Sequence, residues 1–370
     1  MKKLVLSKQV KNIDKKLFWL ILFFVALGLI FVADASAPQA LNAYGDKFFL
    51  LRQQVVWAIV GIVTLFITIN VHYSFWEKIA TPFFFLSILF LLAVLLPHLS
   101  FAALGARRWI SIGAFNFQPS EIIKLSLAIY LAKIAAKNKG AASYFIPLVL
   151  VTGLIMLQPD LGTTLVVAVI GLSQIFISGV NLLYFLGALI TGALGTIGLI
   201  LVSPYRRDRL LTFFETTSDP LGKGYHIRQI LLALGSGGIF GVGLGASRQK
   251  YLFLPEASTD SIFAVIAEEL GLIGSVAIIS LYIYLFVKGV KIARSAPDKF
   301  SKVLAIGIVA WISGQAFLNI ASMVSITPLT GIPLPFLSYG GTSLVMILSA
   351  CGILLNISKY GSYENAMHSR

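Results

Sequence analysis

Long apolar runs recur along the whole chain, and they constrain the fold more than any other feature. The chain has 370 residues, of which 58% are hydrophobic and only 12% are charged. Lipid offers no hydrogen-bond partner to the backbone, so runs of about 18 residues or more that cross it must be helical. Soluble domains do not have this composition. The sequence therefore predicts an all-α polytopic membrane protein, with residues 1–370 forming a single integral membrane domain.

Ten apolar runs are candidate membrane spans. They cover residues 17–33, 53–71, 80–97, 120–137, 144–158, 161–178, 182–202, 261–288, 303–325 and 340–357. Six lysines precede the first run, and basic clusters of this kind stay in the cytoplasm. We therefore expect about ten transmembrane helices, with the N-terminus (1–16) and the C-terminus (358–370) both cytoplasmic.

Charge and cysteine content exclude several kinds of function. In a membrane protein, a net charge of +14 is explained by basic residues that set the orientation of the chain and contact anionic head groups. No nucleic-acid partner is therefore expected. The single cysteine, Cys351, excludes an intrachain disulfide. The sequence contains no Cys/His metal spacing, Walker loop, dinucleotide fingerprint or G-x-S-x-G turn.

One large loop, residues 203–260, is expected on the extracytoplasmic side. Its middle, HIRQILLALGSGGIFGVGLG, is too interrupted to span the membrane and too apolar for open water. We interpret this stretch as a short amphipathic helix on the outer leaflet or re-entering it. Loops of this length in compact proteins are usually functional.

The end of this loop, from Lys250 onward, holds the strongest candidate for catalysis. Asp260 stands where a polar run stops and a long apolar helix begins, four residues after Glu256. Asp260 would therefore lie at the positive end of a helix dipole, at the membrane surface. Glu268 and Glu269 follow about two turns inside, where carboxylates usually face protein or water. The alternative is that Asp260 only caps the helix.

Three further polar clusters fall on the same side of this topology. They are GARRW with QPSEIIK (105–124), QPDLGT (158–163) and PLTGIPLPFLSYGGTS (328–343). Glu121 and Lys124 share a helix face, and Asp160 is placed to cap the sixth span. Each cluster has a structural alternative: an ion pair for Glu121 and Lys124, a cap for Asp160, a helix break for the prolines, and interfacial aromatics for Trp109 and Tyr339.

Carboxylates, arginines and lysines thus gather at one membrane face. Arg and Lys bind diphosphate and a carboxylate can act as a base, so the set suits a phosphate-bearing, lipid-anchored substrate. The residues expected to bind substrate are Glu256, Lys124, Glu121, Asp160, Arg108, Arg206, Arg248, Lys250 and Ser338. A transporter that flips the same lipid, or a non-catalytic scaffold, are the competing interpretations.

Seven motifs in this order resemble the SEDS family of shape, elongation, division and sporulation proteins. They are GARRW, QPSEIIK, QPDLGT, DPLGKGYHIRQ, GVGLGASRQKYLFLPEASTD, FAVIAEELG and GIPLPFLSYGG, and they cover nearly the whole chain. The resemblance implies a ten-span, metal-dependent peptidoglycan glycosyltransferase of the bacterial cytoplasmic (inner) membrane. It also implies a partner, a class B penicillin-binding protein with transpeptidase activity. DPLGKGYHIRQ and LGASRQKYLFLPEA look more like the division subfamily, FtsW, than the elongation subfamily, RodA.

Residue by residue, the resemblance places the family's essential aspartate at Asp260 and its loop glutamate at Glu256. The Glu and Lys of the family's QPSE motif correspond to Glu121 and Lys124, and its QPD aspartate to Asp160.

The chain departs from the family at two positions. The family commonly has H-T-D-F where this chain has Ser258, Thr259, Asp260 and Ser261. Because position 258 is serine, proton transfer by a histidine at that position is excluded here. Because position 261 is also serine, the groove wall lacks an aromatic side chain there.

The resemblance further implies that the substrate is lipid II. Asp260 would take a proton from the acceptor sugar hydroxyl as that oxygen attacks the anomeric carbon of the growing chain. The polyprenyl diphosphate would leave, with its charge held by Arg, Lys and a divalent metal, Mg²⁺ or Mn²⁺, for which Asp260 or Glu256 are candidate ligands. The alternatives are a lipid II flippase and a RodA-like elongation polymerase. Other division or elongation proteins are further expected partners.

Overall fold

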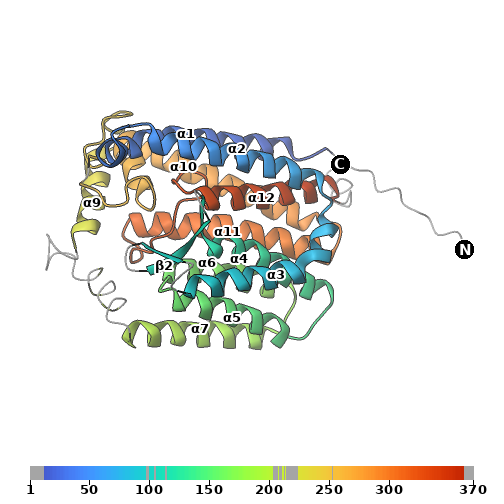
Figure 1. The fold of residues 1–370 in the computed structure, drawn as a ribbon. Coiled ribbons are helices and arrows are strands. Elements are labelled where there is room, and N and C mark those ends of the chain that lie inside the picture. Colours follow the sequence, from blue (N-terminus) through green and yellow to red (C-terminus); the bar gives the residue numbers. More distant parts are fainter. Residues whose placement is uncertain are drawn as a thin grey trace, which may run out of the picture.

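Long helices lie side by side, with their axes roughly parallel or antiparallel (Figure 1). The computed structural model describes residues 12–96, 100–103, 106–112, 115–202, 224–251 and 253–361, together with Arg207, Leu211 and Phe213. The helices are α1 (Lys15–Tyr44), α2 (Phe49–Asn70), α3 (Tyr73–Leu95), α4 (Pro119–Ala136), α5 (Ala142–Leu157), α6 (Leu161–Ile177), α7 (Leu182–Val202), α9 (Tyr225–Gly237), α10 (Ile262–Arg294), α11 (Lys299–Met323) and α12 (Gly341–Lys359).

Hydrogen bonds identify which helix termini share an end of the bundle. Asp14 N–H donates to Ser358 Oγ (3.1 Å), and Lys288 Nζ lies 3.0 Å from Asp14 Oδ2. The start of α1 and the ends of α10 and α12 therefore lie together, and we call this the Asp14 end. The opposite end holds α9 and the residues before α10, and we call it the Asp260 end (Figure 1).

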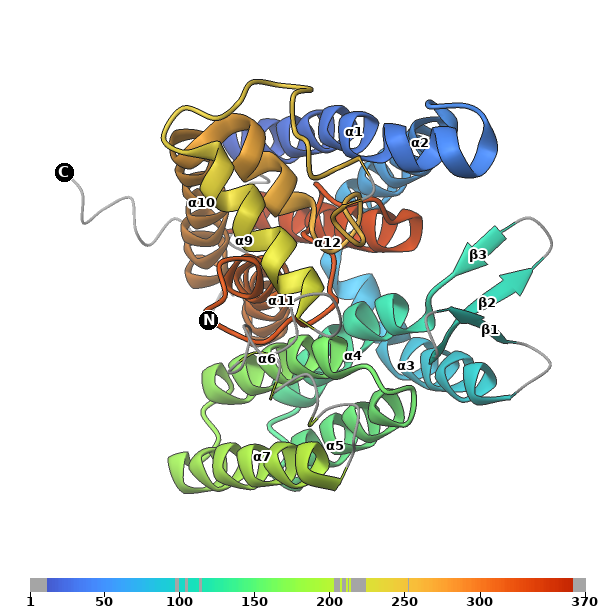
Figure 2. The same ribbon diagram turned by 90° about the vertical axis from the view of Figure 1, so that its left-hand side faces the viewer.

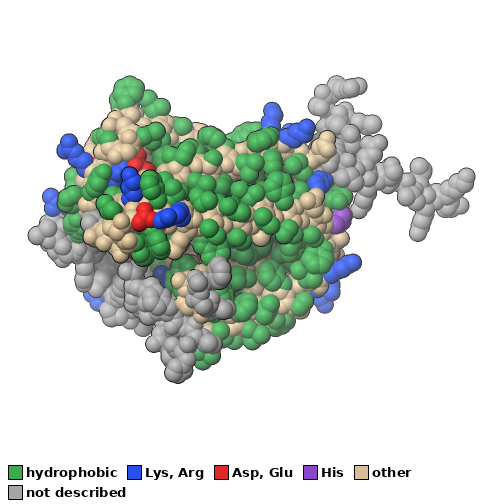
Figure 3. All heavy atoms as spheres, turned by 45° about the horizontal axis from the view of Figure 1, so that its top comes forward, with side chains coloured by type: hydrophobic (Ala, Val, Ile, Leu, Met, Phe, Trp, Pro, Cys, Tyr) green, Lys and Arg blue, Asp and Glu red, His purple; other side chains and the backbone are tan. Residues whose placement is uncertain are grey.

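Each of the ten predicted spans falls on a helix, namely α1–α7 and α10–α12. Six of the described helices, α1, α2, α3, α10, α11 and α12, are long and apolar enough by themselves to cross a membrane. Helices α4, α5 and α6 fall short of that criterion by length or charge, and the described apolar part of α7, Leu182–Gly198, is also shorter, so the count of ten crossings stays a prediction. Hydrophobic side chains cover the middle of the surface, and charged ones gather towards its two ends (Figure 3).

Helix α11 lies in the middle of the bundle and packs against α4, α6 and α10 (Figure 2). It contributes Trp311, one of the largest fully buried side chains. Helix α12 packs along α2, where Gly352 lies directly against the Leu65 carbonyl and Thr68. Any side chain at 352 would separate the two helices, so this glycine sets their close approach.

The region between α3 and α4 differs from expectation, because it contains a small sheet that the sequence did not indicate. Strands β1 (Ser100–Ala103), β2 (Ala106–Ile112) and β3 (Phe115–Phe117) pair antiparallel in the order β1-β2-β3. Strand β2 carries residues 106–109 of the GARRW motif, and it lies towards the Asp260 end (Figure 1). A strand as short as β3 lies below the length at which alternation of apolar residues becomes a usable signal.

Two helices also differ from the predicted spans. Helix α1 was expected over 17–33 but continues through Asp34 and Pro38 to Tyr44, because Lys250 Nζ lies 2.6 Å from Asp34 Oδ1 and compensates its charge. Helix α10 is interrupted at Gly271, whose φ of 65° and ψ of −165° are not helical. The predicted amphipathic segment forms a helix, α9, over Tyr225–Gly237, followed by turns.

Candidate active site

Asp260 lies one residue before the N-cap of α10, at the end of the bundle expected to face outward. The N-cap residue is Ser261, which makes no side-chain capping bond, so Asp260 does not occupy the N-cap position considered for it. The Asp260 side chain is partly exposed. A Cβ atom at Gly331 would lie 3.4 Å from Asp260 Oδ2, so the carboxylate lies against the backbone of the segment that precedes α12.

The backbone around Asp260 is held by that same segment. Ser338 Oγ–H donates to the Thr259 carbonyl (2.6 Å) and in turn accepts from the Leu334 N–H (2.7 Å). Tyr339 N–H donates to the Ser258 carbonyl (2.8 Å). The predicted substrate ligand Ser338 is buried, with 5% of its surface exposed, so in this structure it holds the chain beside Asp260.

Helix α11 ties the two segments together through an amide that the sequence analysis missed. Asn319 Nδ2 donates to the Asp260 carbonyl and to the Ile332 carbonyl, both at 2.8 Å. Asn319 is buried within an otherwise apolar run, and that is the signal that could have identified it.

Helix α9 contacts the residue that follows Asp260. His226 Nε2 lies 2.8 Å from Ser261 Oγ, and Ser261 is fully buried. The serine that replaces the family's aromatic side chain is therefore a hydrogen-bond partner of α9. This contact connects the middle of the long loop to the start of α10.

Glu256 belongs to the same tight turn as Asp260. Its backbone has φ of 51°, and its Oε2 accepts from Thr259 Oγ (2.7 Å). Its side chain is partly exposed. Among the described residues, no group of three or more His, Cys, Asp or Glu side chains could hold a metal ion. One or two carboxylates with water and substrate phosphates are the usual ligands of Mg²⁺, and Asp260 and Glu256, four residues apart, are the carboxylates of this turn.

Glu121 and Lys124 form the predicted pair in the interior, where each is 2% exposed. Lys124 Nζ lies 2.7 Å from Glu121 Oε1 and 2.9 Å from Gln315 Oε1. Gln315 Nε2 donates to the Pro333 carbonyl (2.9 Å). The pair therefore reaches the segment beside Asp260 through Gln315, a second α11 amide that the sequence analysis missed.

Asp160 caps α6, as predicted from its position before the sixth span. Its Oδ1 accepts from the Thr163 N–H and its Oδ2 from Thr163 Oγ, both at 2.9 Å. Arg108 Nε lies 3.7 Å from Asp160 Oδ2, and the Arg108 guanidinium donates to the Pro159 carbonyl (2.7 Å). Gly162 lies against the Thr330 carbonyl, so the start of α6 also abuts the segment beside Asp260.

Lys250 lies in a buried network with Asp34 and Glu269. Its Nζ is 2.6 Å from Asp34 Oδ1 and 2.8 Å from Glu269 Oε1. Burial alone would lower the pKa of Lys250, but these two hydrogen bonds outweigh it and raise that pKa above its usual value. The neighbouring Glu268 accepts from Ser247 Oγ (2.5 Å) and from the Arg248 N–H (3.1 Å).

The ten predicted site residues divide by exposure. Asp260, Glu256, Arg108 and Arg248 are partly or fully exposed, while Glu121, Lys124, Asp160, Lys250 and Ser338 are buried. Arg206 lies outside the described residues. The structure thus gathers the four predicted polar clusters at one end and separates residues that can touch a ligand from residues that hold the site.

Comparisons with known proteins agree with this arrangement. The family model described as "Cell cycle protein", for FtsW, RodA and SpoVE, matches residues 15–363. Stage V sporulation protein E of Bacillus subtilis (strain 168) is 40% identical over 358 residues, which cover 95% of this chain and 98% of that protein. The probable peptidoglycan glycosyltransferase FtsW of Trichlorobacter lovleyi is 37% identical over 353 residues, 93% of each chain.

A solved structure also superposes on this chain. It is described as "Structural coordination of polymerization and crosslinking by a peptidoglycan synthase complex", with a TM-score of 0.77 and 28% identity over 94% of this chain and 97% of that one. The helices long enough to cross a membrane and these relatives make the chain a multi-pass membrane protein. It belongs to the FtsW, RodA and SpoVE family of cell-cycle proteins, the SEDS family.

Proposed function

We propose that this chain is a peptidoglycan glycosyltransferase that polymerises lipid II at the outer face of the bacterial cytoplasmic membrane, with Asp260 as its general base. The observation that carries the proposal is the partly exposed Asp260 carboxylate, set beside Gly331 at the end where all four polar clusters meet. The activity printed in the name of the FtsW relative supports the reaction class.

In the proposed reaction, an acceptor sugar hydroxyl attacks the anomeric carbon of the growing glycan. A bond forms between that oxygen and the anomeric carbon, the bond to the diphosphate oxygen breaks, and the hydroxyl proton passes to Asp260. Direct displacement inverts the configuration at this carbon. The bonds from Ser338 and Asn319 to the backbone on either side of Asp260 keep its carboxylate in place.

The leaving diphosphate needs positive charge. Arg248 is exposed and lies eight residues before Glu256 in the same loop, so we assign it to the diphosphate. We propose that Asp260 or Glu256 would hold a divalent ion, which would supply further positive charge for the diphosphate. Lys124 and Lys250 are both buried in ion pairs, and we assign them to support of the site.

A lipid II flippase stays the second candidate because α10 is broken at Gly271. Broken helices with nearby charges form the substrate sites of many transporters. Here, however, the backbone groups around the break are paired: Leu272 N–H donates to the Gly238 carbonyl (2.9 Å) and Val242 N–H to the Glu268 carbonyl (3.0 Å). A passage would need these groups to face water, so the structure favours the polymerase.

The membrane placement and partners belong to the same proposal. Both termini would be cytoplasmic, with residues 203–260 outside. The complex of the solved relative coordinates polymerization and crosslinking, so we propose a class B penicillin-binding transpeptidase as partner. The FtsW relative and the family description "Cell cycle protein" support a role in division.

The test is direct synthesis from purified components. The full chain, with a partner transpeptidase and Mg²⁺ or Mn²⁺, is incubated with lipid II, and the glycan strands are resolved on a gel. A ladder of polymer that depends on the chain supports the proposal. Movement of lipid II across vesicles without any polymer would instead assign the chain as a flippase.

A further inference from the structure

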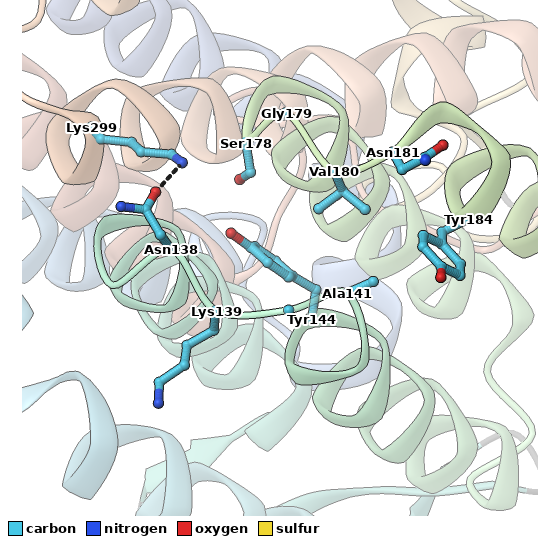
Figure 4. A pocket seen from close by; sticks show the side chains of 11 residues that line it. Asn138, Lys139, Ala141, Tyr144, Ser178, Gly179, Val180, Asn181, Tyr184 and Lys299 are labelled. Atoms are coloured by element: carbon cyan, nitrogen blue, oxygen red, sulfur yellow. Dashed lines mark hydrogen bonds between the residues drawn. The ribbon is translucent and has the colours of Figure 1, made fainter.

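A cavity of about 280 Å³ opens at the Asp14 end, away from Asp260 (Figure 4). It lies where the turn between α4 and α5, the turn between α6 and α7, and the start of α11 meet. Its polar lining includes Asn138, Lys139, Tyr144, Ser178, Asn181 and Lys299. None of these residues takes part in the proposed active site.

The charge of this cavity is entirely positive. No Asp or Glu lines it, while Lys139 and Lys299 are both exposed. Lys299 Nζ donates to Asn138 Oδ1 (2.7 Å), a neutral partner that leaves its charge uncompensated. Among the described residues, no ion pair involves either lysine.

Helix ends add to this field. Helices α5 and α7 both begin at the cavity, after Ala141 and Asn181, so the positive ends of two helix dipoles point at it. Ala141 provides no side-chain cap for α5, and the first N–H groups of that helix donate instead to the Gly140 and Ala141 carbonyls. The hydroxyls of Tyr144 and Ser178 point towards each other, Lys299 points to Asn138, and Lys139 extends away from these side chains (Figure 4).

The surface beside the cavity is apolar. Leu182 and Leu183 at the start of α7 are 57% and 76% exposed, and Ile146 on α5 is 67% exposed. Acyl chains would cover such side chains in a membrane, which places a lipid head group at the level of the cavity. Anionic head groups are common in the cytoplasmic leaflet, the side on which this end is expected.

We propose that this cavity binds the phosphate-bearing head group of an anionic phospholipid of the cytoplasmic leaflet. Lys299 and, at the rim of the cavity, Lys139 supply the positive charge for the phosphate, and the dipoles of α5 and α7 add to this field. The acyl chains lie along α5 and α7. This site is independent of the glycosyltransferase reaction, so its test measures binding alone.

The experiment titrates short-chain phosphatidylglycerol into the detergent-purified full chain and follows binding by calorimetry. Three forms are compared: wild type, Lys139→Gln with Lys299→Gln, and Lys137→Gln with Lys302→Gln. The last pair removes the same charge from exposed lysines near the same end that do not line the cavity. A basic residue near an anionic lipid surface contributes about fivefold in affinity. We therefore expect at least about tenfold weaker binding for the cavity pair and little change for the control pair.

Arginine at both cavity positions keeps the charge, so that variant is expected to retain binding. If both glutamine double variants bind phosphatidylglycerol equally weakly, general surface charge explains the binding, and the proposed site is overturned. Equal binding of phosphatidylcholine would remove the anionic specificity. Inorganic phosphate that binds as tightly as phosphatidylglycerol would show that the ligand is a free anion, which overturns the lipid assignment.

Discussion

Lys124 contacts a carboxylate, an amide and an aromatic ring in the interior of the bundle. Its ammonium pairs with Glu121, is buried from solvent, and lies 5.1 Å from the ring centre of Trp311. Trp311 Nε1 and Lys124 Nζ both donate to the same oxygen of Gln315. The position of Gln315, and through it of the segment beside Asp260, therefore depends on this charge.

Removing one partner of this pair leaves a buried charge without compensation, which typically costs about 3–5 kcal/mol. We expect Glu121→Gln or Lys124→Met alone to lower the thermal unfolding midpoint and to abolish most glycan synthesis. The double variant should recover part of both, because no buried charge remains. Unfolding curves and glycan gels of the three variants check this. Full activity in both single variants would contradict a role for the pair.

Lys250 and Arg248 are close in sequence, but Lys250 is buried and Arg248 is exposed. We therefore expect their substitutions to have different effects on stability and activity. Lys250→Met should destabilise the fold by about 3–5 kcal/mol, since Asp34 and Glu269 lose their buried cation. Because the pKa of Lys250 is raised above its usual value of 10.5, this stabilisation is fully present below pH 10.5 and is lost only as pH rises through the raised pKa.

Arg248→Gln, in contrast, should leave the unfolding midpoint unchanged and raise the KM for lipid II by about tenfold, as expected for loss of a charged contact to diphosphate. Its side chain is exposed, so the matched pair separates a structural lysine from a ligand-binding arginine. Unfolding curves and rates at varied lipid II concentration give both quantities. Destabilisation by Arg248→Gln, or none by Lys250→Met, would reverse the assignments.

At the scale of elements, α1 is longer than its predicted span and α10 is interrupted, and both features help to hold the loop that leads to Asp260. The extension of α1 beyond residue 33 supplies Asp34 to Lys250 and Gln39 to Ser258, whose Oγ lies 3.3 Å from Gln39 Oε1. The break of α10 at Gly271 lets its first part pair with the turns after α9. The loop that leads to Asp260 is thus held on both sides.

Gly271→Ala should disturb this arrangement. The φ of 65° is unfavourable for alanine, which costs about 1–3 kcal/mol, and its Cβ would press on the backbone of Ile239 and Gly241. The control is Gly153→Ala in α5, where a Cβ meets nothing within 4 Å and the helix should gain about 0.5–1 kcal/mol. Thermal unfolding distinguishes them, and equal midpoints would contradict the account of the break.

For the whole molecule, hydropathy predicted much of the fold, because a run that enters lipid has no option but a helix. The extension of α1 could not be predicted, since Asp34 and Lys250 are 216 residues apart in sequence. The motifs indicated Asp260 and gathered the polar clusters at one end. They could not separate exposed Arg248 from buried Lys250, nor identify Gln315 and Asn319, because those roles depend on which helix faces meet.

The central claim is that Asp260 acts as the general base of glycan polymerisation. The most direct measurement compares the glycan strands made from lipid II by wild type, Asp260→Asn and the control Asp46→Asn, with partner transpeptidase and divalent metal supplied. Asp46 lies in the loop between α1 and α2, also at the Asp260 end, so its substitution makes the same chemical change nearby. We predict about 10²–10⁴-fold less polymer from Asp260→Asn, an unchanged unfolding midpoint, and normal polymer from Asp46→Asn. Equal polymer from Asp260→Asn and wild type would contradict the account.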